Sequence, residues 1–120
     1  MGDPIADLEL DEMDGVPVAR ISGEIDISIA ASLTSRLRAA RVQEASGMVV
    51  DLTRVDYLDS SGLRLLLKTA TSLEELKQKL HLVVGEGSVV ERLLAMTRTD
   101  DILTVHRTVA DAVRALTPAT

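Results

Sequence analysis

The chain has 120 residues and a formal net charge of −6, and its composition already excludes several classes of protein. Hydrophobic residues make up 46% of it, yet Phe and Trp are absent and there is a single Tyr, so we expect an aliphatic core. The acidic balance and the lack of aromatic stacking groups argue against nucleic-acid binding. The absence of cysteine excludes disulfides and thiolate-bound zinc.

The length and the hydropathy pattern are typical of one globular domain. We expect a single domain over residues 1–120 with an ordered core at about 6–117. No stretch approaches the roughly 18 consecutive apolar residues of a membrane span. The acidic start at residues 1–4 differs from the basic start of a signal peptide, so we expect a cytoplasmic protein.

The first elements predicted along the chain are a hairpin and a helix. Residues 6–13 alternate between apolar and acidic side chains, which indicates a half-exposed strand. The Asp14-Gly15 pair predicts a tight turn, and residues 16–22 read as the returning strand. A helical spacing of apolar residues follows, with Asp26 or Ser28 as its cap.

A buried strand and a long helix form the middle of the chain. The apolar run at 48–52 predicts an interior strand, followed by a loop at 53–59. An unbroken leucine stripe then predicts one helix from Ser60 to about Lys79.

The last third of the chain repeats the alternation of strand and helix. We expect a strand at 82–84, a short helix opened by the capping box at Ser88–Glu91, and a strand at 102–105. Thr108 should cap a final helix. The resulting order is β-β-α-β-α-β-α-β-α, which predicts an α/β fold with a mixed sheet of four or five strands and about four helices. Right-handed crossovers would place the helices against the sheet, mainly on one face.

Five further side chains are assigned by pattern. We expect Met48, Met96 and Tyr57 to lie in the core, the last beneath the 53–59 loop. His81 and His106 read as strand residues rather than metal ligands.

The most informative stretch is Asp59-Ser60-Ser61-Gly62, at the junction of a strand and a helix. A hydroxyl group at this point lies against the positive end of a helix, where a phosphate or an anionic partner group is favoured. Taken alone, the stretch is compatible with a helix cap, a nucleophile or a regulatory switch.

The surrounding residues resemble a known family. The segment 49–63, with its Asp59-Ser60-Ser61-Gly62 turn, resembles the signature of STAS domains, particularly those of bacterial anti-sigma factor antagonists. The upstream Gly23-Glu24-Ile25-Asp26 is similar to the second landmark of that family, and the order of elements agrees across the whole domain.

The resemblance implies a phosphorylation switch at Ser60. In such antagonists the unphosphorylated form binds an anti-sigma factor with a histidine-kinase-like ATPase fold and thereby frees a sigma factor. That partner phosphorylates the serine, and a PP2C-type phosphatase resets it. Asp26 should border the partner-binding surface, and as candidate contacts we also include Asp59, Ser61, Gly62 and Arg64.

These candidates have different expected roles. Ser61 should support the first helical turn, and Gly62 should let a partner approach closely. Arg64 departs from the family, because many members have a small residue there, and it bears on which partner is recognised. Ser60 and Asp26 each have a purely structural alternative as helix caps. The oligomeric state is expected to be a monomer or a weak dimer.

Two other functional classes stay open. One is a STAS scaffold, or a subunit of a sensory or lipid-transport complex, without phosphorylation. The other is a serine hydrolase that uses Ser60, but Leu58 replaces the first glycine of a nucleophile elbow. No dinucleotide-binding glycine motif follows the first strand, which argues against a dinucleotide fold. As the resemblance implies, we expect a kinase substrate and binding partner rather than an enzyme, and no cofactor.

Overall fold

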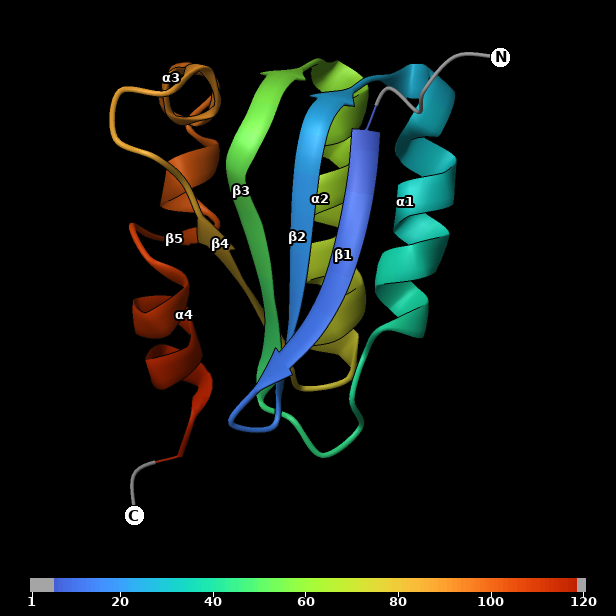
Figure 1. The fold of residues 1–120 in the computed structure, drawn as a ribbon, viewed down its shortest axis with the longest axis vertical. Helices are drawn as coiled ribbons and strands as arrows, with labels where there is room; N and C mark the ends of the chain where they lie inside the picture. Colours follow the sequence, from blue (N-terminus) through green and yellow to red (C-terminus); the bar gives the residue numbers. More distant parts are fainter. Residues whose placement is uncertain (1–5, 119–120) are drawn as a thin grey trace.

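A five-stranded mixed sheet runs through the molecule (Figure 1). The computed structural model describes residues 6–118, so the acidic start at 1–4 lies outside the described part. The strands follow the order β1-β2-β3-β4-β5, and their bounds are Ala6–Met13, Val16–Ile25, Gly47–Leu58, Lys79–Val83 and Thr104–His106. β1 and β2 are antiparallel, whereas all the other neighbours are parallel. The predicted hairpin turn is confirmed, since Asp14 and Gly15 both have positive φ, at 52° and 80°.

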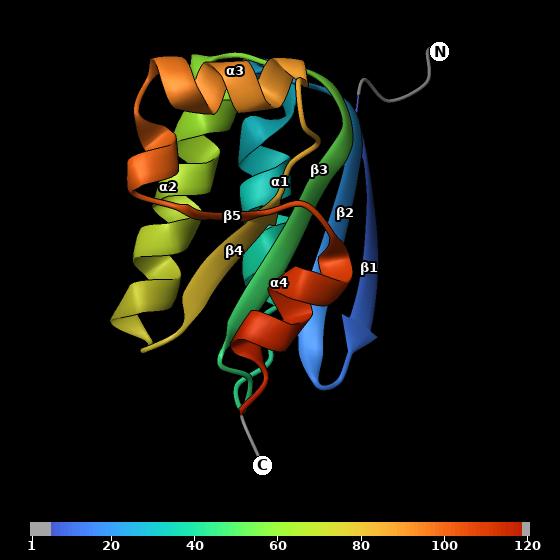
Figure 2. The same ribbon diagram turned by 90° about the vertical axis from the view of Figure 1, so that its left-hand side faces the viewer.

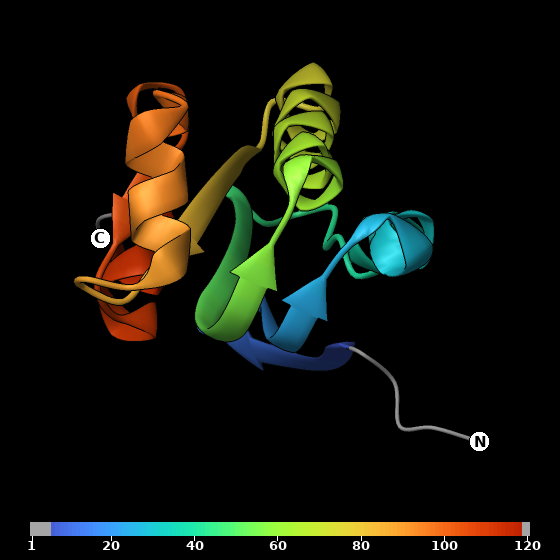
Figure 3. The same ribbon diagram turned by 90° about the horizontal axis from the view of Figure 1, so that it is seen from above.

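The helices lie on both faces of this sheet, but mainly on one. They are α1 (Ile27–Ala39), α2 (Ser60–Glu75), α3 (Val89–Met96) and α4 (Val109–Leu116), with a short 3₁₀ turn η1 at Thr99–Asp101. Buried residues of α1, α2 and α3 share one core with the sheet. α4 alone contributes to a second core on the opposite face, and Figures 2 and 3 show it on the other side of the strands from α1 and α2.

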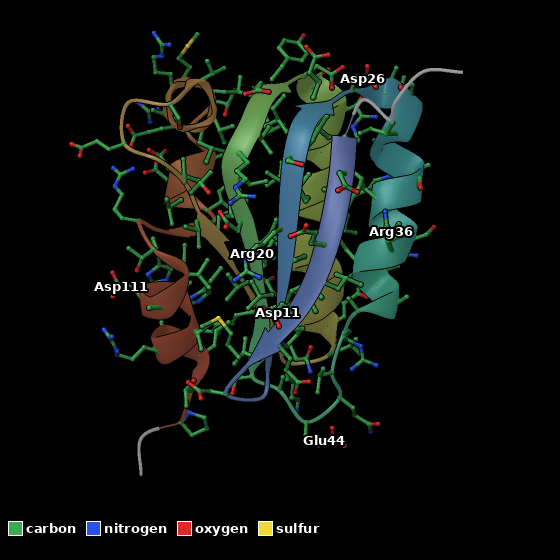
Figure 4. The ribbon with its side chains drawn as sticks, in the orientation of Figure 1. Asp11, Arg20, Asp26, Arg36, Glu44 and Asp111 are labelled. Carbon is green, nitrogen blue, oxygen red and sulfur yellow. The ribbon has the colours of Figure 1, made fainter. Side chains whose placement is uncertain are left out.

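The second core is small because α4 covers only part of its face. Val18 and Val49 are fully buried beneath it, so the first halves of β2 and β3 are apolar on both sides. Beyond α4 the second half of β3 exposes Arg54 and Asp56. Arg20 and Asp11 form an ion pair on the same open face, 3.0 Å apart and in front of the sheet in Figure 4.

β3 differs from its prediction in length. The segment 53–58, expected as a loop, continues the strand as far as Leu58. An irregularity in the register between β2 and β3 turns both Asp56 and Tyr57 outward, while Val55 and Leu58 face the core. Tyr57 is therefore 48% exposed, and its expected place in the core is wrong.

The long helix also ends earlier than predicted. Lys77 adopts a left-handed φ of 61°. The amide of Gln78 then donates to the carbonyl of Leu73, and that of Lys77 donates to Glu74, which is the Schellman arrangement at a helix end. The chain therefore enters β4 at Lys79, three residues before the expected strand.

Two smaller expectations are also wrong. The last strand is shorter and later than 102–105, because the 3₁₀ turn occupies the preceding residues and leaves Ile102 70% exposed. Met96, expected in the core, is 81% exposed at the last residue of α3, whereas Met48 is buried as predicted.

Candidate functional site

Two helices begin side by side at the carboxyl edge of the sheet. The ends of β2 and β3 are register partners at Ile25 and Leu58, and α1 and α2 start directly beyond them (Figure 1). Asp26 caps α1 by accepting a hydrogen bond from the amide of Ser28 at 2.9 Å. Figure 4 shows Asp26 at this end of the molecule. Of the two predicted caps, Asp26 is therefore the correct one.

Asp59 has the equivalent role for α2. Its Oδ1 accepts from the amides of Ser61, at 2.8 Å, and Gly62, at 3.1 Å. Its own amide donates to the carbonyl of Ile25 at 3.2 Å, which ties the turn to the neighbouring strand. One carboxylate thus satisfies two of the amide groups that a helix leaves free at its start.

This arrangement leaves the hydroxyl of Ser60 free. Ser60 is exposed and is the first residue of α2, and within residues 6–118 its side chain takes part in no hydrogen bond. The reading of Ser60 as a helix cap is therefore wrong, because Asp59 is the cap. An uncommitted hydroxyl at a positive helix terminus is accessible to a modifying enzyme and favourable for a phosphate.

Ser61 and Gly62 stabilise the turn at the start of α2. Ser61 is half-buried, and its contribution to the first helical turn comes from the amide that donates to Asp59. Gly62 is buried, and a Cβ atom there would lie 2.4 Å from Cδ1 of Leu58 and 3.0 Å from Cγ2 of Ile25. The glycine therefore lets α2 pack closely onto the strands that precede it, and its expected contact with a partner stays a prediction.

An apolar hollow opens beside Ser60. Its volume is about 570 Å³, and its lining includes Ser60 with Tyr57, Leu63, Val89, Leu93 and Met96. Val89 is 46% exposed, and Tyr57 and Met96 are exposed as well. Three large hydrophobic side chains therefore lie around the serine outside the core. Exposed hydrophobic side chains that gather at one place are typical of a protein-binding surface. The sequence pattern missed this hollow because it placed two of its residues in the core.

Arg64 lies one helical turn after Ser60 on α2. It is exposed and lines a second hollow, on the α1 side of the helix, together with Ser61 and Lys68. Residues four apart on a helix are neighbours, so the Arg64 side chain is within reach of a group attached to Ser60. The structure thus brings five of the six candidate residues together at the start of α2, with Asp26 at the adjacent helix start.

The two histidines of the chain are engaged with each other. Nε2 of His106 lies 3.0 Å from Nδ1 of His81, and the rings stack with centroids 5.0 Å apart. They belong to β5 and β4, as predicted, and neither lines the hollow beside Ser60. Burial lowers the pKa of His81, and the charges of His106 and Lys79 lower it further. This pairing counts against a histidine base for Ser60.

The described residues offer neither a metal site nor a membrane-spanning helix. No three His, Asp or Glu side chains within 6–118 are grouped so as to hold a metal ion. None of the helices in that range is both long and apolar enough to cross a membrane.

Comparisons with known proteins agree on the family. The family model of the STAS domain matches residues 7–112 of this chain. The anti-sigma-F factor antagonist RsfB of Mycobacterium tuberculosis is 33% identical over 82% of this chain and 79% of its own length. The anti-sigma-B factor antagonist of Listeria monocytogenes is 32% identical over 71% of this chain and 74% of its own.

The structural comparison gives the same result. The crystal structure of an anti-sigma factor antagonist from Mycobacterium paratuberculosis superposes with a TM-score of 0.84 and 27% identity, over 98% of this chain and all of the other. The agreement extends across the mixed sheet and its helices, and the expected STAS-like α/β fold is confirmed. This chain belongs to the STAS domain family, among relatives that are anti-sigma factor antagonists.

Proposed function

We propose that this protein is an anti-sigma factor antagonist whose binding to its partner is switched off by phosphorylation of Ser60. The observation that carries the proposal is the free, exposed hydroxyl of Ser60, since Asp59 has taken the capping role. The names of the relatives support the antagonist function. The partner is an anti-sigma factor with a kinase activity, and a PP2C-type phosphatase reverses the modification in the cytoplasm.

The exposed hydrophobic side chains around Ser60 support a protein partner. Tyr57, Val89 and Met96 would lose contact with water when a partner covers the hollow. Ser60 lies within the same lining, so a partner that fills the hollow would also enclose the hydroxyl. A phosphate at that point would become buried in the interface.

Electrostatics explain why phosphorylation would release the partner. A phosphate on Ser60 adds a charge of about −1.5 to −2. Asp59 and the exposed Asp56, near the end of β3, already place negative charge beside Ser60. Covering the added charge would cost binding free energy, and a loss of about 3 kcal/mol weakens binding by more than 100-fold.

A binding assay with purified variants tests the switch. The wild-type chain, Ser60→Ala, Ser60→Asp and the control Ser61→Ala would each be immobilised and exposed to a lysate, followed by identification of the retained kinase-like anti-sigma factor. We expect wild type, Ser60→Ala and Ser61→Ala to retain it and Ser60→Asp to lose it. Retention by Ser60→Asp at wild-type affinity would contradict the proposal.

A phosphorylation assay tests the site of modification. With the retained partner and ATP, phosphate should enter wild type and Ser61→Ala but not Ser60→Ala, as seen by mass spectrometry of the intact chain. If no partner modifies Ser60, the alternative of an unphosphorylated STAS scaffold is favoured.

A further inference from the structure

A basic region lies on the α1–α2 layer of this acidic protein. The segments 27–43 and 60–73 contain Arg36, Arg38, Arg41, Arg64 and Lys68 and no Asp or Glu, although the whole chain carries a net charge of −6. The remaining surface is therefore strongly acidic. Such a separation of charge on one molecule indicates a surface that attracts an acidic partner.

Two of these cations are available in a hollow at the start of the helices. This α1–α2 hollow has a volume of about 240 Å³ and is lined by α1 and α2, including Ile27, Ala30, Ala31, Ser61, Arg64 and Lys68. Arg64 and Lys68 are exposed. The ion pairs found within 6–118 are Arg20–Asp11, Arg107–Glu91 and Arg114–Asp111, so neither cation of the hollow is paired in that part of the chain.

The other cations of the layer are placed differently. Arg36 donates to the carbonyl of Leu8 at 3.2 Å and so faces β1. Arg38 and Arg41 line a separate hollow further along the two helices, which also contains Glu75. The lining of the α1–α2 hollow thus contains cations and no carboxylate, although the capping carboxylates of Asp26 and Asp59 are next to its residues Ile27 and Ser61.

The wall of the hollow also has an apolar component. Ile27 is 78% exposed, and Ala30 and Ala31 present only methyl groups beside it. A ligand that matches the hollow therefore combines carboxylates, for Arg64 and Lys68, with apolar side chains for the α1 side. An acidic amphipathic protein segment has this combination.

We propose that the α1–α2 hollow binds an acidic amphipathic segment of the anti-sigma factor partner. The inference rests on the proposed function for the identity of that partner. An anionic membrane or a nucleic acid fits less well, because either would extend beyond the hollow onto surface of the same negative sign. A short peptide segment needs to contact only the hollow.

The position of Arg64 couples this hollow to the switch. Ser60 and Arg64 are four residues apart on α2, an arrangement in which a negative group placed N-terminal to a cation pairs well. A phosphate on Ser60 would pair with Arg64 and compete with the carboxylates of the partner. Phosphorylation would then remove an attractive contact as well as add a repulsive one.

The test uses a designed probe and the full chain. A helical peptide of about 16 residues with Glu and Leu on one face is added to ¹⁵N-labelled protein, and a second peptide with Lys at every Glu position is the control. We expect the acidic peptide to shift the amide signals of Ile27–Thr34 and Ser61–Lys68. Binding of the Lys peptide with the same shifts, or no shifts with the acidic peptide, would overturn the proposal.

Charge reversal provides the matched comparison. Replacing Arg64 and Lys68 by Glu should weaken acidic-peptide binding by about tenfold or more, since two surface contacts change from attraction to repulsion. The control replaces Arg54 and Arg98, two exposed cations outside the hollow, by Glu and should bind as wild type does. Equal weakening by both variants would show a general charge effect and would contradict a specific site. The ¹⁵N spectrum of each variant establishes that it is folded.

Two further measurements separate this inference from its alternatives. Vesicles that contain phosphatidylglycerol should leave the same amide signals unshifted, and shifts with vesicles but not with the peptide would overturn the choice of a protein segment. The charge-reversed variant is also tested against the partner retained in the binding assay. If the partner affinity is unchanged and Ser60 still acts as the switch, the hollow is not the binding site, and the proposed function stands. If the peptide binds but Ser60 is never phosphorylated, the proposed function fails, and the binding role of the hollow stands.

Discussion

At the scale of single residues, the neighbours Asp59 and Ser60 have different roles at the start of α2. Asp59 supplies the oxygen that the helix amides need, and Ser60 keeps its hydroxyl for other chemistry. The observed arrangement allows the modification to leave the cap intact.

This division predicts a contrast in stability. Asp59→Ala should lower the free energy of unfolding by about 1 kcal/mol, the usual cost of losing a helix cap. Ser60→Ala should change it by less than about 0.5 kcal/mol, because an exposed and unbonded hydroxyl is lost. Urea denaturation followed by circular dichroism measures both. A larger loss in Ser60→Ala than in Asp59→Ala would show that the serine is the cap after all.

At the scale of elements, β4 and β5 are joined partly by the His81–His106 pair. The hydrogen bond between the rings requires that at least one nitrogen be unprotonated. Because burial lowers the pKa of His81 from its ordinary 6.5, the unfolded chain takes up a proton at this site more readily than the folded chain. The stability that the neutral His81 side chain contributes to the fold is therefore fully present above pH 6.5 and is lost as the pH falls below that value.

The expected outcome is a stability that declines in mildly acidic solution. As the pH falls below 6.5 the free energy of unfolding should decrease, by at most about 1.4 kcal/mol per pH unit for each proton. His81→Gln should flatten this slope. The pKa values of Asp11 and Glu91 are lowered from 3.8 and 4.5, so the stability that these two carboxylates contribute is lost at lower pH than that of His81. An unchanged slope in the variant, measured by urea titrations at several pH values, would refute the assignment.

At the scale of the whole molecule, the fold places Ser60 on the surface, so that a group added to it would lie outside the core. The two helix starts lie at the carboxyl edge of the sheet, and the main core lies below them between the sheet and α1, α2 and α3 (Figure 1). The proposed switch would therefore act on what binds to the molecule, not on the molecule itself.

This separation predicts that phosphorylated protein stays folded. A phosphate on Ser60 should change the free energy of unfolding by less than about 1 kcal/mol, because the helix terminus stabilises it locally by a similar small amount. Protein carrying phosphoserine at position 60 would be compared with unmodified protein by thermal and urea denaturation. A loss of several kcal/mol would mean that release of a partner follows from unfolding.

Much of the fold and the position of the site could be predicted because local sequence determines them. The hairpin at Asp14-Gly15 and the caps at Asp26, Ser88 and Thr108 depend on the preferences of a few consecutive residues. The strand-turn-helix setting of Ser60 follows from the same kind of signal.

Other features depend on contacts between distant segments, and only the tertiary structure decided them. The early end of α2 is accompanied by Gln78, whose side chain donates to the carbonyls of Val42 and Ala45, both at 2.9 Å. Tyr57 and Met96 are apolar enough for a core, but the register of β3 and the last turn of α3 expose them. The hollow beside Ser60 and the basic α1–α2 hollow arise where helices from separate parts of the chain meet. Periodicity assigns a side chain to a face of its own element, but the neighbour that covers that face is set by packing, and packing is a property of the whole chain.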